Sequence, residues 1–134
     1  MGWTMPGIMN ITLWILQFLL AAVFLAHGLM LLFPPANLIE QMNASMSTGF
    51  RVFLGVAEVL ATVGLILPGL TRVMPWLVVS AAAGVMIVMV SATVFHAARG
   101  EWSSTAITFV LLLLATFVAY GRWKVLPIGP RKLV

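Results

Sequence analysis

Four long runs of apolar residues constrain the fold of this chain more than any other feature of its sequence. A hydrocarbon core about 30 Å thick is crossed by about 20 apolar residues in a helix. Within lipid, a span must satisfy its own backbone hydrogen bonds, and these runs lack the two-residue alternation of barrel strands. The expected fold class is therefore all-α: one membrane domain, residues 1–134, forming a bundle of four transmembrane helices. We predict the spans at residues 11–33, 50–70, 75–96 and 103–120.

The scarcity of charge supports this assignment. The composition is 63% apolar and 7% charged, against about 25% charged in ordinary soluble domains. So few charges could not cover the surface of a soluble fold, and the lipid bilayer is the expected partner. The basic residues lie beside the apolar runs and form no stripe, which argues against nucleic-acid binding. The absence of cysteine excludes thiolate chemistry and cysteine-bound clusters, and no pair of residues has the spacing of a zinc or di-iron motif.

The basic residues also predict how the chain is oriented. An even number of spans puts both termini on one side, together with the loop between the second and third spans. Five basic residues belong to that side, against Arg51 and Arg99 on the other, so the positive-inside rule makes both termini cytoplasmic in the cell (inner) membrane. The five are Arg72, Arg122, Lys124, Arg131 and Lys132. The first span is expected to be retained, because its apolar run is too long for a signal peptide and no basic residue precedes it.

The segment 34–49 is expected to face outward as an interfacial loop. Its apolar residues recur at helical spacing, which suggests a short amphipathic helix at the interface; a plain polar loop is the alternative. These residues are Leu38, Ile39, Met42 and Met46.

Polar residues inside the spans indicate a site. A charge at mid-membrane costs about 2.5–3.5 kcal/mol, yet Glu58 lies roughly 13 Å into the second span at 1.5 Å per residue. His27 lies roughly 10 Å from the same end of the antiparallel first span. We predict a polar pocket in the outer half of the bundle, in which a carboxyl and an imidazole could transfer protons. The catalytic candidates are Glu58, His96 and His27, and the ligand-binding candidates are Arg51 at the entrance, Gln17 and Thr62. The alternative is a structural role, in which a Glu–His hydrogen bond fixes the helix register.

Three segments resemble the DoxX-like family of small four-helix membrane proteins, over about residues 11–124. They are Gly55–Pro68 with Glu58, Ser91–Glu101 with His96, and Tyr120–Trp123. The resemblance implies a four-helix inner-membrane bundle and carries over Glu58 and His96 as family-pattern positions. Many such proteins have a lysine three residues after the first-helix glycine, whereas here Leu31 follows Gly28 at that spacing. His27 is the candidate to replace that lysine.

Three functions remain open at this stage. The leading hypothesis, which the family name also implies because it derives from a thiosulfate:quinone oxidoreductase subunit, is a subunit that binds a hydrophobic molecule such as a quinone. Such a subunit would support a redox reaction run with a partner protein, since no cofactor motif is evident in the chain. The second is a stand-alone acid/base enzyme, an isomerase or cyclase acting on a lipid-like substrate. The third is a non-catalytic assembly or scaffold protein. A homodimer is a further candidate, because a four-helix unit is small and presents small-residue faces.

Overall fold

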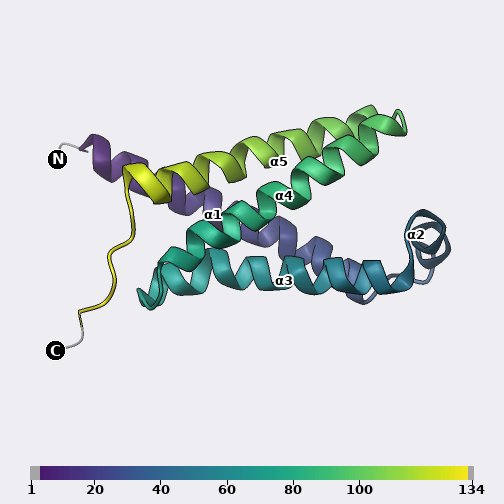
Figure 1. The fold of residues 1–134 in the computed structure, drawn as a ribbon, viewed down its shortest axis with the longest axis horizontal. Helices are drawn as coiled ribbons and strands as arrows, with labels where there is room; N and C mark the ends of the chain where they lie inside the picture. Colours follow the sequence, from purple (N-terminus) through teal and green to yellow (C-terminus); the bar gives the residue numbers. More distant parts are fainter. Residues whose placement is uncertain (1–3, 133–134) are drawn as a thin grey trace.

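The computed structural model describes residues 4–132, all of whose regular structure is helical. Four long helices follow the chain, with one short helix between the first two (Figure 1). The elements are α1 (Met5–Leu32), α2 (Ile39–Ser45), α3 (Thr48–Thr71), α4 (Trp76–Ala98), α5 (Trp102–Tyr120) and a π-helical turn, η1 (Gly121–Val125). Each long helix is long and apolar enough to cross a membrane, which confirms the predicted fold class.

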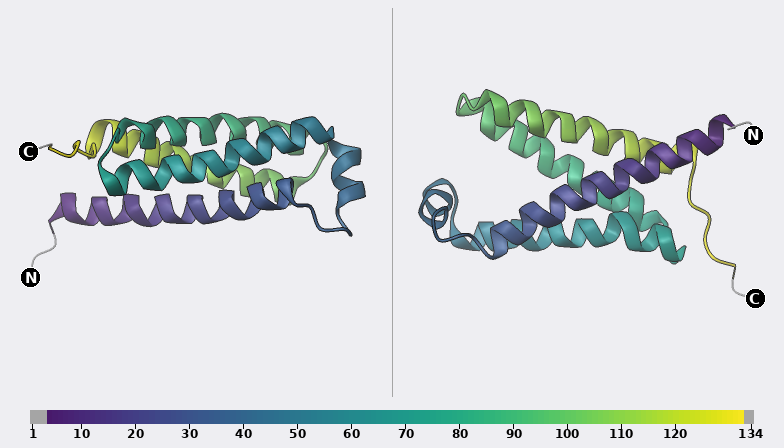
Figure 2. Two further views of the ribbon diagram at one scale, coloured as in Figure 1. Left: turned by 90° about the horizontal axis from the view of Figure 1, so that it is seen from below. Right: turned by 180° about the vertical axis from the view of Figure 1, so that it is seen from behind.

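The helices form an open bundle in which consecutive long helices run antiparallel (Figures 1 and 2). α1 packs mainly on α3, α4 packs on α5, and α3 packs on α4. The start of α1, the α3–α4 connection and residues 126–132 lie at one end, which we call the terminal end. The short helix α2 and the turn between α4 and α5 lie at the opposite end, which we call the α2 end. There, the α1–α3 pair and the α4–α5 pair diverge (Figure 1).

The first helix begins at Met5, six residues before the start of the predicted span at residue 11. The Thr4 side chain accepts a hydrogen bond from the Gly7 amide, and Pro6 occupies the first turn, where its missing N–H costs nothing. Its 28 residues span about 42 Å, more than the hydrocarbon core requires. The segment 34–49 contains the short helix α2, so the predicted short helix is present and a plain loop is not.

The core lies where all four long helices meet. Phe24 from α1, Leu65 from α3, Val85 from α4 and Val118 from α5 are buried in one cluster. In contrast, large apolar side chains are exposed on the outside of every long helix, among them Leu60 on α3. An exposed apolar belt of this extent belongs in lipid.

α1 and α3 approach each other most closely at two glycines. A Cβ atom built on Gly28 would lie 3.0 Å from the carbonyl oxygen of Gly55, and one built on Gly55 would lie 3.0 Å from the carbonyl oxygen of Gly28. Backbones come this near only where both residues lack a side chain. This crossing brings Glu58, one turn further along α3, beside α1.

Candidate functional site

Glu58 and His27 form a hydrogen-bonded pair across the α1–α3 contact. Glu58 Oε2 lies 2.6 Å from His27 Nδ1. The Glu58 side chain is 2% exposed, whereas that of His27 is 47% exposed and reaches the outer surface of α1. A proton can lie on either partner, as a neutral acid–imidazole pair or as a carboxylate–imidazolium pair, and both arrangements lower the cost of burying the carboxyl. The predicted proximity of these two residues is confirmed.

Thr62 fixes the position of this pair without joining it. Its hydroxyl donates to the carbonyl oxygen of Ala21 on α1 at 3.2 Å and to that of Glu58 at 3.1 Å. A hydroxyl that bonds to two backbone carbonyls satisfies itself in lipid and holds α3 against α1. Thr62 therefore positions the helix that carries Glu58.

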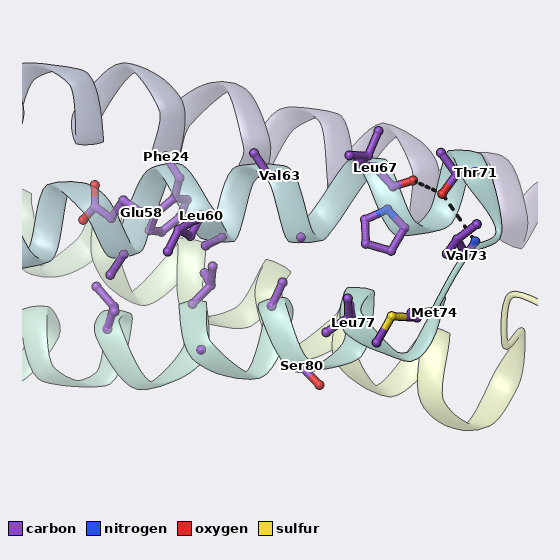
Figure 3. A pocket seen from close by; sticks show the side chains of 18 residues that line it. Phe24, Glu58, Leu60, Val63, Leu67, Thr71, Val73, Met74, Leu77 and Ser80 are labelled. Carbon is purple, nitrogen blue, oxygen red and sulfur yellow. Dashed lines mark hydrogen bonds between the residues drawn. The ribbon is translucent and has the colours of Figure 1, made fainter.

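A groove of about 860 Å³ runs between α3 and α4, with Phe24 of α1 contributing near one end. Figure 3 shows Glu58 at one end of this groove and Thr71, Val73 and Met74 at the other. The walls between them are aliphatic or small, among them Ala57, Ala61, Gly64, Ala81 and Gly84. The sequence predicted a polar pocket in the outer half of the bundle. The structure instead has an apolar groove with one carboxyl residue at its α2 end.

The predicted grouping of His96 with Glu58 and His27 is wrong. His96 Nδ1 lies 2.5 Å from Glu101 Oε2, and Arg99 Nε donates to Glu101 Oε1 at 2.7 Å. Gly100, at φ 70°, reverses the chain between α4 and α5 and brings these side chains together. The α4–α5 turn diverges from α1 and α3 at this end (Figure 1), so similar depth does not bring His96 to Glu58. The Arg99 and His96 hydrogen bonds keep the pKa of Glu101 below its ordinary value.

Arg51 and Gln17 also lie outside the groove. Arg51 is buried and donates through a terminal nitrogen to the carbonyl oxygen of Leu31 at the end of α1. Gln17 is buried toward the terminal end, where its amide donates to the carbonyl oxygen of Leu65 at 2.7 Å. Neither residue lines the groove beside Glu58.

A second polar cluster, which the sequence pattern did not predict, surrounds Arg122. Arg122 Nε donates to Gln17 Oε1 at 2.6 Å, and Nη1 donates to Asn10 Oδ1 at 2.8 Å. The guanidinium carbon lies 5.2 Å from the centre of the Trp14 ring. By sequence, Arg122 lies beyond the predicted fourth span and counts only as a cytoplasmic charge. The sequence signal for an inward position is Gln17, a polar residue inside the first span that needs a polar partner at the same depth.

Metal ligands do not gather anywhere in the part of the chain that the structure describes: no three His, Asp or Glu side chains come together in residues 4–132. The candidate site is therefore defined by the Glu58–His27 pair and the adjoining groove.

Four apolar helices with a lipid-facing outer surface and a buried carboxyl bonded to an imidazole define a multi-pass membrane protein. Comparison with protein families then gives a more specific assignment. The model of the DoxX-like family matches residues 15–118, and the chain belongs to this family. The match includes both members of the Glu58–His27 pair and ends before Arg122. No curated protein and no solved structure matched the chain.

Proposed function

We propose that this DoxX-like protein binds an apolar molecule with a polar head, of the quinone class, in the α3–α4 groove, and that it supports a membrane redox reaction run with a partner protein. The observation that carries this proposal is the position of Glu58. Of the three acidic residues in the sequence, it is the one inside a membrane-spanning helix, and it lies at the end of an apolar groove. Ionisable residues within membrane spans usually serve function.

The groove suits a ligand with an apolar tail and a small polar head. Its volume of about 860 Å³ lies within the range of about 300–1,000 Å³ that is usual for small-molecule sites. A prenyl-type tail would pack along the aliphatic walls, and the head would lie near Glu58. A quinone carbonyl accepts hydrogen bonds. In this proposal its donor is the Glu58–His27 pair, which shares a proton.

The reaction would need electrons from elsewhere. Reduction of a quinone to a quinol takes two electrons and two protons, and a carboxyl–imidazole pair handles only the protons. The chain has no cysteine with which to hold an iron–sulfur cluster. The electrons are therefore assigned to a partner oxidoreductase, and the role of this chain is to bind the quinone and to exchange protons with it.

Filling the groove tests the proposal. A Cβ built on Gly84 meets no atom within 4 Å, so Gly84→Leu should occupy the groove without displacing its walls. The matched control is Ala83→Leu, which enlarges an exposed neighbour on α4 outside the groove. Binding of a short-chain quinone would be measured by thermal unfolding in lipid nanodiscs. Ligand at about a hundred times its Kd stabilises a protein by about 2.7 kcal/mol.

We expect quinone to stabilise the wild type and Ala83→Leu, and to leave Gly84→Leu unchanged. Glu58→Gln should weaken binding of the quinone more than binding of a matched hydrocarbon that lacks the carbonyls. The proposal fails if the wild type gains no stability, or if Gly84→Leu binds as the wild type does. If Glu58→Gln changes only the unfolding temperature of the unliganded protein, the pair serves packing, as the scaffold hypothesis requires.

A further inference from the structure

Arg122 is a buried cation that no acidic side chain of the chain neutralises. The residue is 4% exposed, and its hydrogen bonds go to the side-chain oxygens of Gln17 and Asn10 and to the carbonyl oxygen of Leu126. All three acceptors are neutral. Within residues 4–132, its buried Nη2 atom has no hydrogen-bond partner. A buried charge that is neither paired nor fully hydrogen-bonded is costly.

The acidic residues of this protein lie elsewhere. Glu58 is bound to His27, and Glu101 is bound to His96 and Arg99. The third, Glu40, belongs to α2 at the opposite end of the molecule (Figure 1). The counter-charge for Arg122 is therefore not an acidic side chain of the same molecule.

A cavity of about 510 Å³ lies beside Arg122 at the terminal end. A second cation, Arg72, lines it together with Asn10, Trp14 and the chain segment 126–129. Arg72 Nε donates to the carbonyl oxygen of Gly129 at 2.9 Å, which ties this segment to the end of α3. Arg72 adopts a left-handed backbone conformation, φ 58°, at the end of α3. Two arginine residues that are far apart in the sequence thus line one cavity.

We propose that this cavity is a binding site for a phosphate group, held between Arg122 and Arg72. Guanidinium groups bind phosphate oxygens through paired N–H donors, and Arg122 Nη2 is a donor that no acceptor within residues 4–132 uses. The cavity opens at the level where the helices end, so the phosphate can belong to an anionic lipid headgroup or to a soluble phosphorylated molecule. The site is independent of the α3–α4 groove and of the function proposed for it.

The test compares two charge-neutralising variants with a control. Arg122→Gln and Arg72→Gln each remove one guanidinium from the cavity. Lys124→Gln removes the same charge at the same end, but Lys124 lies over the Trp123 ring and does not line the cavity. Purified protein would be incubated in mixed micelles with phosphatidylglycerol or with phosphatidylcholine, and bound lipid would be counted by native mass spectrometry. A parallel arm would measure thermal stabilisation by inorganic phosphate in phosphatidylcholine nanodiscs.

We expect a phosphatidylglycerol adduct on the wild type that Lys124→Gln retains. Losing a charge-assisted hydrogen bond lowers affinity by about tenfold or more, which is the loss expected for Arg72→Gln and Arg122→Gln. The same pattern with inorganic phosphate, without a lipid adduct, would support the site and assign it to a soluble phosphate. The proposal is overturned if neither anion binds, or if Lys124→Gln loses as much binding as Arg72→Gln. Because Arg72 is exposed, its variant remains informative even if Arg122→Gln does not fold.

Discussion

At the scale of single residues, the central feature is the contact between Glu58 and His27. It places a carboxyl in the middle of a span. Hydrogen bonds between membrane helices contribute about 0.6 kcal/mol on average and at most about 1.7 kcal/mol. We predict a coupling energy in this range between Glu58→Leu and His27→Leu, measured as a double-mutant cycle of unfolding in mixed micelles.

A matched cycle serves as the control for that measurement. Thr116 bonds only to the carbonyl of Leu112 on its own helix, α5. Glu58→Leu and Thr116→Ala should therefore be additive, because the two residues share no partner. A coupling between Glu58 and His27 that is no larger than this control would show that their contact contributes nothing to stability.

Glu101 predicts, also at the scale of a single residue, how the stability of the protein depends on pH. Arg99 and His96 lower its pKa below the ordinary value of 4.5, so the folded protein favours the ionised carboxylate. The stabilisation is therefore fully present above about pH 4.5 and is lost as the pH falls through the lower pKa of the folded state. The unfolding temperature of the wild type should fall more steeply below pH 4.5 than that of Glu101→Gln. Parallel profiles for the two proteins would contradict this assignment.

The sequence could predict only the site contacts that follow from how deep a residue lies in the membrane. Counting residues from the ends of antiparallel spans brought His27 and Glu58 to the same level, and the close glycine contact makes them neighbours. His96 has a similar depth, but depth does not tell which helices touch. The hydrogen-bond partner of His96 is Glu101, five residues later in the sequence, which the turn between α4 and α5 brings beside it.

At the scale of elements, the glycine contact between α1 and α3 is a constraint of backbone against backbone. Gly28→Ala would place a methyl group 3.0 Å from the backbone oxygen of Gly55, and a backbone can yield only if the helices separate. Overpacking of this kind typically costs about 1–3 kcal/mol. Gly84→Ala is the control, because its Cβ would meet no atom within 4 Å and alanine favours the helix. Unfolding in mixed micelles should show loss of stability for the first variant and none for the second.

The long helices were predictable as elements because length and apolar character alone define a span. Their ends were less so. α1 starts early because of Thr4 and Pro6, which are local signals outside the apolar run. The chain continues past Tyr120 in the π turn, closed by the Leu126 amide bonding to the Gly121 carbonyl at 2.7 Å. No hydrophobic pattern specifies such a turn, and this is why the inward position of Arg122 was not foreseen.

At the scale of the whole molecule, the start of α1 and residues 126–132 lie at the same end (Figure 1). Five of the seven basic residues belong to the segments at this end. The positive-inside rule predicts that this end is cytoplasmic. A green fluorescent protein fused after residue 134 should therefore fluoresce, and an alkaline phosphatase inserted at Asn37 should be active. The reverse pattern would show that the chain is inserted the other way round.

The depth of Glu58 has an electrical consequence. Moving one elementary charge across a membrane costs or releases about 2.3 kcal/mol per 100 mV. Glu58 lies ten residues from the start of α3, which is about 15 Å along the helix, or roughly half of the hydrocarbon core. A proton that travels from the α2 end to the Glu58–His27 pair therefore crosses roughly half of the field, worth about 1 kcal/mol at 100 mV. The proton occupancy of the pair should therefore respond to the membrane voltage, so an energised membrane and a depolarised one would load the same pair differently.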